Sequence, residues 1–265
     1  MLAAAVKADL KAGRPSIGSW LSMAHESIAE ILAGAGYDWV VVETEHTAID
    51  VSEVLRLMMA IEGAGSLPFV RVAWNDPIQI KAVLDSGAAG ILVPMVNSAA
   101  DARAAVDACK YPPLGKRGVG LARAQGYGQN FKEYVERANE DGLLMVQIEH
   151  VDAVRNIEEI LDVEGIDGTF IGPYDMSLSM GIPGQLEHPD ILAAMDTVLE
   201  ATKARGLTPG IHLVHPDGAE RRLAEVLGKG YRFLAMGTDI LFLGDSARSL
   251  ARTAMRAAGR DEGGA

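Results

Sequence analysis

Short apolar segments alternate with helical patterns along most of the chain. Eight segments have the length and composition of strands buried on both faces of a parallel sheet, at residues 16–21, 39–43, 68–72, 90–94, 143–149, 168–172, 208–213 and 232–236. Helical patterns follow most of them, at residues 27–35, 51–60, 78–86, 99–108, 151–161, 189–204 and 219–227. This alternation over about 250 residues predicts a (β/α)8 barrel.

An open doubly wound sheet is the main alternative fold. That fold usually carries a glycine-rich phosphate loop after its first strand. The nearest candidate here, Gly34-Ala35-Gly36, precedes a strand and lacks the third glycine. We interpret these glycines as a helix C-cap and a turn, and therefore favour the closed barrel.

Residues 143–177 predict a strand, a helix, a second strand and a loop, with a carboxylate after each strand. The first strand ends in Gln147 and Glu149, and the loop after the second strand carries Asp175. Because the carboxyl ends of neighbouring parallel strands lie side by side, we expect Glu149 and Asp175 to converge. Two carboxylates held in this way make a site for a hard divalent cation.

Other polar residues fall at predicted strand ends, where a barrel of this kind carries out its chemistry. Glu43, Glu45 and His46 end the second strand, and Arg71 lies in the third. Arg71 could grip a carboxylate or an enolate oxygen, or it could be a structural ion-pair partner of Glu43. His46 could carry a proton near neutral pH, or it could be a loop histidine.

Three further residues have two interpretations each. Asp85, at the end of a helix, is either a capping or surface group or a partner that raises the basicity of His46. His212 and His215, at the end of the seventh strand, could be metal ligands, but we expect them to line the mouth of the pocket.

The connection after the fourth strand, residues 95–141, is the longest in the chain. Long loops on the catalytic face of a barrel often serve as substrate lids. Its Lys116, Arg117 and Arg123 would supply positive charge to such a lid. A solvated basic loop is the alternative.

Composition narrows the class of protein. The chain has 265 residues, 49% of them apolar, and no linker divides it, so we expect one domain over residues 1–265 with a flexible tail from about 258. The net charge of −12 argues against nucleic-acid and membrane partners. No leader or membrane span is evident, and a single cysteine, Cys109, favours a reducing cytoplasm.

Lysines are absent from the carboxyl ends of the predicted strands. An aldolase that works through a Schiff base needs a buried lysine at such a position. The chain is therefore suited to metal-assisted rather than imine chemistry.

Several motifs together resemble the HpcH/HpaI family of metal-dependent class II pyruvate aldolases. They are Glu43-Thr44-Glu45-His46, Pro68-x-Val70-Arg71, Tyr111-Pro112-Pro113-x-Gly115-x-Arg117-Gly118, Val146-Gln147-Ile148-Glu149 and Gly168-x-x-x-Gly172-Pro173-x-Asp175-x-Ser177. The resemblance extends over about residues 13–244. Two positions depart from it, because the family often has Asp in place of Glu43 and a small residue in place of Tyr174.

The resemblance implies a role for each matching residue. Glu149 and Asp175 would bind a divalent cation, Mg²⁺, Mn²⁺ or Co²⁺, and Arg71 would stabilise the enolate. The proton-transferring base would be His46, with Asp85 behind it. Substrate contacts would come from Gln147, the backbone at Tyr174, Asp175 and Arg71, and we add His212 and Arg123 as substrate-binding candidates.

The expected reaction is the cleavage or formation of 4-hydroxy-2-oxo acids, to or from pyruvate or hydroxypyruvate and an aldehyde. Two alternatives stay open: a lyase for 3-hydroxyacyl-coenzyme A thioesters of the malyl or citryl type, and a barrel that binds sugar acids without catalysis. The amphipathic segment 241–258 predicts a homo-oligomer. The resemblance implies a hexamer built from three dimers.

Overall fold

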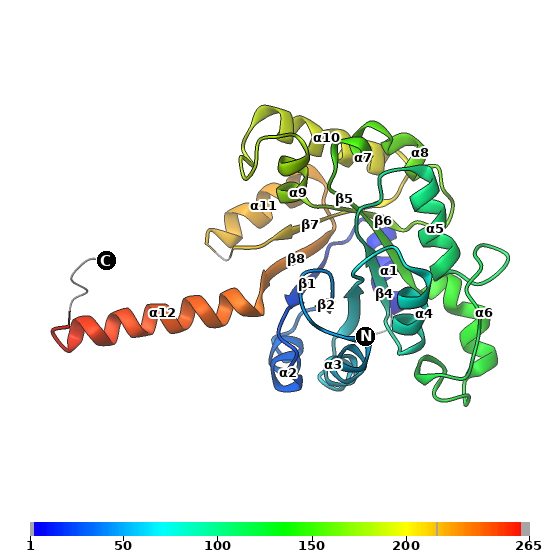
Figure 1. Cartoon of the computed structure of the whole chain (residues 1–265), viewed down its shortest axis with the longest axis horizontal. Helices are drawn as coiled ribbons and strands as arrows, with labels where there is room; N and C mark the ends of the chain where they lie inside the picture. Colours follow the sequence, from blue (N-terminus) through cyan, green and yellow to red (C-terminus); the bar gives the residue numbers. More distant parts are fainter. Residues whose placement is uncertain (1–2, 216, 261–265) are drawn as a thin grey trace.

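Eight parallel strands form the centre of the molecule. A computed structural model describes residues 3–215 and 217–260. In this part of the chain the strands pair in sequence order and close into a barrel (Figure 1). They are β1 (Ser16–Leu21), β2 (Trp39–Glu43), β3 (Leu67–Arg71), β4 (Gly90–Val93), β5 (Leu143–Ile148), β6 (Gly168–Ile171), β7 (Thr208–Leu213) and β8 (Phe233–Thr238). The predicted barrel is confirmed, with every strand within two residues of its expected bounds.

Helices surround the barrel and return the chain to the start of each next strand. They are α1 (Ala3–Lys11), α2 (Glu26–Gly34), α3 (Val51–Gly63), α4 (Pro77–Asp85), α5 (Ala99–Cys109), α6 (Phe131–Asp141), α7 (Val151–Arg155), α8 (Ile157–Leu161), α9 (Pro173–Ser179), α10 (Pro189–Ala204), α11 (Ala219–Lys229) and α12 (Asp239–Ala257). The helix predicted over 151–161 is two short helices, α7 and α8, that meet at Asn156. The loop predicted at Pro173 is the first turn of α9, where proline is well tolerated.

Aromatic rings fill the interior of the barrel. Trp39 stacks on Phe233, with ring centres 4.1 Å apart and planes 5° apart. A Cβ atom at Gly18 would lie 2.1 Å from the Trp39 ring, and one at Gly90 would lie 2.1 Å from Phe69. Glycines at these strand positions therefore leave the space that the rings occupy.

The amino-terminal end of the barrel, called the floor below, is covered by α1. Val6 and Leu10 of α1 are buried against apolar side chains of the strands. Lys7 Nζ lies 2.7 Å from Asp167, and Lys110 Nζ lies 3.5 Å from the same carboxylate. Burial lowers the pKa of Lys110, and the nearby Asp167 opposes that shift. Apolar packing and a buried ion cluster together hold this end shut.

Residues 110–142 of the long connection after β4 lie at the floor, so the prediction of a substrate lid was wrong. Helix α5 carries the chain back to the amino ends of the strands before residues 110–142 begin. There Lys110 Nζ donates to the carbonyl of Gly142 at 2.9 Å, and Arg117 is buried. Lys116 is 81% exposed and pairs with Asp107, as the alternative of a solvated basic residue requires. Only segments that follow a strand directly reach the catalytic end of a barrel.

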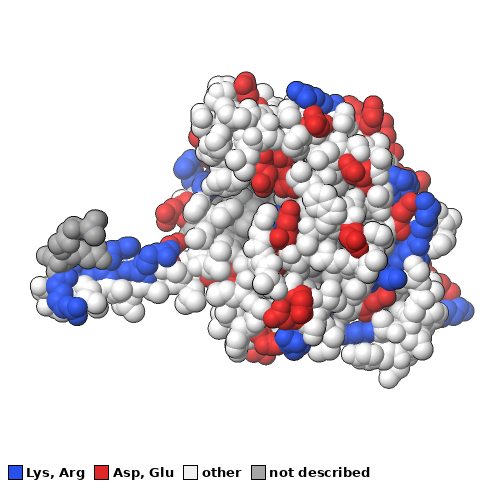
Figure 2. Space-filling view, in the orientation of Figure 1, with Lys and Arg blue, Asp and Glu red and all other residues white. Residues whose placement is uncertain are grey.

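Helix α12 extends away from the barrel (Figure 1). Leu243 and Leu250 on it are 59% and 71% exposed. Figure 2 shows basic side chains gathered along this arm and acidic ones scattered over the body. The predicted tail from about 258 falls largely outside the described residues, which end at 260. None of the helices in the described ranges is long and apolar enough to cross a membrane.

Candidate functional site

Two carboxylates hold Arg71 at the carboxyl-terminal end of the barrel, called the mouth below. Arg71 ends β3 and lies in register with Glu43, the last residue of β2. Its guanidinium pairs with Glu43, and its Nη1 lies 3.2 Å from Oε2 of Glu45. The ion pair with Glu43 that the sequence left open is therefore present. The buried Nε of Arg71 has no hydrogen-bond partner among the described residues, so pairing has not consumed all of its donors.

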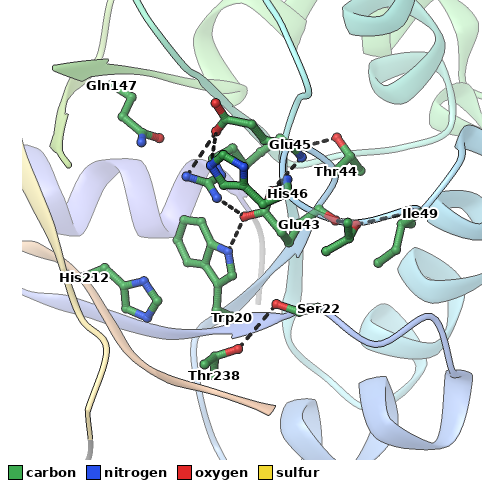
Figure 3. A network of polar contacts seen from close by, with 12 residues as sticks. Trp20, Ser22, Glu43, Thr44, Glu45, His46, Ile49, Gln147, His212 and Thr238 are labelled. Atoms are coloured by element: carbon green, nitrogen blue, oxygen red, sulfur yellow. Dashed lines mark hydrogen bonds and ion pairs between the residues drawn. The ribbon is translucent and has the colours of Figure 1, made fainter. Parts of the chain in front are cut away.

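Glu43 connects three neighbouring strands at the mouth (Figure 3). Its Oε2 accepts a hydrogen bond from Nε1 of Trp20, on β1, at 2.6 Å. Its Oε1 accepts from the backbone N–H groups of Glu45 and His46, at 2.6 and 3.2 Å. The Arg71 guanidinium carbon lies 5.2 Å from the centre of the Trp20 ring. The loop after β2 is thus fixed against both Trp20 and Arg71.

Glu45 is a partly buried carboxylate in a crowded negative environment. Its pKa is raised to about 7, first by burial and then by the charges of Glu149, Glu43 and Asp175, while Arg71 opposes the shift. Its Oε2 has no hydrogen-bond donor among the described side chains and backbone groups. The acidic groups that follow β5 and β6 therefore act through space on the carboxyl that follows β2.

Glu149 is positioned by its neighbours on both oxygens. The Met95 backbone N–H donates to Oε1 at 2.8 Å, and Nε2 of Gln147 donates to Oε2. Burial raises the pKa of Glu149, and the charge of Asp175 adds to that shift. A Cβ atom at Gly172 would lie 2.8 Å from both Cβ and Oε2 of Glu149, so only glycine fits there.

The donor set at the mouth fits a hard divalent cation with two protein ligands. The charge of Asp175 raises the cost of a negative charge on Glu149, and a cation would relieve that cost. The buried Oε1 of Gln147 is without a partner among the described residues. The described ranges contain no group of three or more His, Cys, Asp and Glu side chains that could hold a metal. Substrate and water would have to supply the remaining ligands.

His212 lies on β7 beside this network (Figure 3). Its ring stacks on Trp20, with ring centres 4.7 Å apart and planes 18° apart. Its Nε2 lies 2.9 Å from the carbonyl oxygen of Gly237. Burial lowers the pKa of His212 to about 4, although the Gly237 bond opposes the shift. The His212 imidazole is therefore neutral at physiological pH, which does not favour a role for it as a charged group.

Two candidate residues lie away from the mouth within one chain, which corrects two expectations. Asp85 ends α4 near the floor and accepts from Nη2 of Arg117 at 2.6 Å, so it does not reach His46. Arg123 pairs with Glu62, at the end of α3, rather than contacting a substrate at the mouth. The Arg123 expectation follows from the misplacement of the long connection, whereas that for Asp85 came from the resemblance. Their partners and the ends of α3 and α4 all lie at the floor.

The remaining candidates lie at the mouth, and their side chains are more exposed. The His46 side chain is 63% exposed, and its Nε2 lies 3.9 Å from Oε2 of Glu45. Tyr174 is in the first turn of α9 and is 46% exposed. His215 is exposed just after β7. Glu45, rather than Asp85, is the carboxylate that this chain itself places beside His46.

Sequence reasoning missed two residues of the site. Met95 has a backbone φ of 53° and uses its N–H to hold Glu149. Such a left-handed residue other than glycine is uncommon, and the sequence carries no signal for it. Trp20 is the second. A tryptophan at a strand end, where its N–H needs a partner, could have been recognised beside the acidic end of β2.

Comparisons with known proteins agree with this architecture. The family model described as "HpcH/HpaI aldolase/citrate lyase" matches residues 16–244. Proteins named 4-hydroxy-2-oxo-heptane-1,7-dioate aldolase from Shigella sonnei and Escherichia coli are each 45% identical over 247 residues, 92% of either chain. A crystal structure of an HpcH/HpaI aldolase/citrate lyase family protein from Burkholderia cenocepacia J2315 superposes with a TM-score of 0.88. It is 34% identical and covers 94% of this chain and 98% of its own.

Proposed function

Because this chain belongs to the HpcH/HpaI aldolase/citrate lyase family and is an aldolase, a carbon–carbon lyase, we propose that it acts on 4-hydroxy-2-oxo acids. Cleavage between C3 and C4 would give pyruvate or hydroxypyruvate and an aldehyde, and the reverse reaction would join them. The name of these relatives describes such a substrate, a seven-carbon dioate with a 2-oxo and a 4-hydroxy group. The observation that carries the proposal is the pairing of Arg71 with Glu45 at the mouth, the end of the barrel where Glu149 follows β5.

We propose Glu149 and Asp175 as the ligands of a divalent cation, Mg²⁺, Mn²⁺ or Co²⁺. When bound, the cation would draw electron density from the keto oxygen of the substrate and so favour an enolate at C3. Gln147 and the backbone N–H of Met95 hold Glu149 in one orientation, which reduces the reorganisation needed when the site fills.

Arg71 is the cation that the chain itself offers to the developing negative charge. Its contacts with Glu43 and Glu45 fix the guanidinium at the mouth before a substrate arrives. Preorganised donors of this kind lower the barrier because they need not move when the charge appears. We propose that it binds the carboxylate or enolate oxygens of the 2-oxo acid, with Gln147 and the backbone at Tyr174 as further contacts.

His46 is the proposed base. In cleavage it takes the proton of the C4 hydroxyl, the C3–C4 electron pair becomes the enolate, and the aldehyde leaves with a new C=O bond. The enolate then gains a proton at C3. His46 lies on a loop whose backbone is fixed by Glu43, while its ring stays mostly exposed, so a bound substrate can reach it.

The position of the long connection weighs against the thioester alternative. A lyase for coenzyme A thioesters needs basic groups near the mouth for the nucleotide phosphates. Arg117 and Arg123 lie at the floor and are paired there with Asp85 and Glu62. A non-catalytic sugar-acid-binding barrel would leave Arg71 and His46 without a chemical task.

A metal-reconstitution assay tests the proposed function. Protein stripped with a chelator should form no product from pyruvate or hydroxypyruvate and an aldehyde, and adding Mg²⁺, Mn²⁺ or Co²⁺ should restore turnover. Borohydride in the presence of substrate should not inactivate it. A Glu149→Gln variant should remain folded and lose turnover. Activity that persists without metal, or trapping by borohydride, would contradict the proposal.

We also propose that the chain forms an oligomer, a hexamer of three dimers, through α12. The exposed apolar side chains of this arm support the proposal, since they have little to pack on within the chain. An oligomer would also offer Asp85 a route to the His46 of another chain. A cytoplasmic location fits the single, buried thiol of Cys109, whose pKa burial raises to about 12.

A further inference from the structure

One polar group beside the network at the mouth is left unused, the second ring nitrogen of His212. The partner of Nε2 is the carbonyl oxygen of Gly237, at 2.9 Å. A carbonyl can only accept, so Nε2 carries the hydrogen of the neutral ring. Nδ1 is then a lone-pair acceptor. No donor within residues 3–215 or 217–260 contacts it.

The orientation of the His212 ring is fixed from two sides. Trp20 stacks against the ring, and Trp20 is itself held by its hydrogen bond to Glu43. Gly237 has a φ of 64°, and a Cβ atom there would lie 2.2 Å from Phe242, so the backbone that presents the carbonyl is also specified. A ring held in this way cannot flip to exchange its two nitrogens without losing the Gly237 bond. The acceptor is therefore a permanent feature of the site.

Charge decides what this acceptor can bind. The neighbours of His212 include the guanidinium of Arg71 and the carboxylate of Glu43, and a pKa near 4 keeps the imidazole neutral above pH 5. A neutral lone pair attracts a donor and gives nothing to a carboxylate, which at neutral pH is an acceptor only. Among the groups of small oxo acids and aldehydes, the hydroxyl is the donor that fits.

We propose that Nδ1 of His212 accepts a hydrogen bond from a hydroxyl group of the substrate, and so makes this enzyme selective for hydroxylated substrates. The inference rests on the proposed function. The hydroxyl has two chemical sources, C3 of hydroxypyruvate as the 2-oxo acid or C2 of a hydroxyaldehyde such as glycolaldehyde. A site that hydrogen-bonds a substrate hydroxyl discriminates against the analogue that lacks it.

Two pairs of substrates and three variants test the proposal in the metal-loaded enzyme. The first pair is hydroxypyruvate and pyruvate with one aldehyde; the second is glycolaldehyde and acetaldehyde with one 2-oxo acid. We expect kcat/KM to favour the hydroxylated member of one pair by about fivefold to tenfold, the effect of one hydrogen bond. The pair in which the preference appears identifies the source of the hydroxyl.

The variants distinguish the loss of the Nδ1 acceptor from the loss of the Nε2 hydrogen bond to Gly237. His212→Gln can keep an N–H for Gly237 while losing the Nδ1 acceptor, and should abolish the preference. His212→Asn can keep an oxygen near the Nδ1 position, and should retain part of it. His212→Leu should abolish it as well, with circular dichroism as the control for folding. Equal preferences in wild type and in His212→Gln would overturn the proposal.

Calorimetry with the same four compounds measures the hydroxyl preference as a ratio of Kd values, without turnover. Protein that forms no product but loses its hydroxyl preference in Kd on His212→Gln would contradict the proposed function and support this inference. Active protein whose hydroxyl preferences in kcat/KM and Kd are unchanged in His212→Gln would support the proposed function and contradict this inference.

Discussion

At the scale of single residues, the mouth is a set of charges that restrain one another. Arg71 is shared between Glu43 and Glu45, and Glu43 also binds Trp20 and the backbone after β2. Each contact is made before any ligand is present. Substitutions here should therefore change chemistry more than fold, provided that the shape of the side chain is kept.

Replacing Arg71 by lysine tests whether the guanidinium is needed for catalysis. Lysine keeps the charge but cannot span two carboxylates and a bound oxyanion with fixed donors. We expect kcat to fall by about 10²-fold, the usual effect of losing one donor to a developing charge. Steady-state kinetics checks this result, with thermal unfolding as the control. A lysine variant with wild-type kcat would show that charge alone is sufficient.

The Glu45 carboxyl predicts a pH dependence of stability in metal-free protein. Its pKa of about 7 in the folded chain lies above the ordinary value of 4.5, so between these pH values the folded state binds more protons than the unfolded state. The free energy of unfolding should then fall as the pH rises from 4.5 to 7, by at most about 3 kcal/mol. Urea unfolding across this range, with chelator, measures it. Glu45→Gln should remove this contribution, and an identical slope in the variant would exclude Glu45 as its source.

At the scale of elements, the sequence predicted the strands well because each one is largely buried and mostly apolar. The ends of β2, β3 and β5 could be assigned for the same reason, since Glu43, Arg71 and Glu149 interrupt apolar runs. The long connection was misplaced because its length suggested a lid, while α5 within it returned the chain to the floor. Arg123 was expected at the mouth as a consequence, whereas the role of Asp85 came from the resemblance, and the single chain pairs Asp85 with Arg117. Met95 depends on a backbone conformation that composition does not reveal.

The junction of β6 and α9 gives a prediction about metal affinity. Gly172→Ala would add a Cβ atom 2.8 Å from Oε2 of Glu149, so the carboxylate must move. We expect the Kd for the divalent cation to rise by about tenfold or more, as when support for a metal ligand is lost. Gly34→Ala is the matched control, because a Cβ atom at that helical position meets nothing within 4 Å. Calorimetry should find the control unchanged, and equal affinities in both variants would refute the steric argument.

At the scale of the whole molecule, the barrel and its arm have different surfaces. The arm α12 carries basic residues on one side and apolar residues on the other, whereas the chain as a whole is acidic, with a net charge of −12 (Figure 2). Such an arm can attract another acidic body and still bury its apolar side against it.

A charge on the apolar side of α12 should therefore disrupt assembly. We expect Leu250→Glu to reduce the molar mass measured by light scattering, because Leu250 is 71% exposed in the single chain and would be buried in an oligomer. Ser249→Glu, which lies about 100° around the same helix from Leu250 and outside its apolar side, should leave the mass unchanged. The same mass for both variants would show that α12 does not form the interface.

Because the floor is covered, the barrel opens only at the mouth. With α1 packed over the far end and the Lys7–Asp167 pair beneath it, reactants and products must pass through the same opening. A longer substrate can then extend only outward, into solvent, once its reacting carbons are seated. The interior can stay unchanged while the rim, formed by residues such as Tyr174 and His46, adapts to new aldehydes.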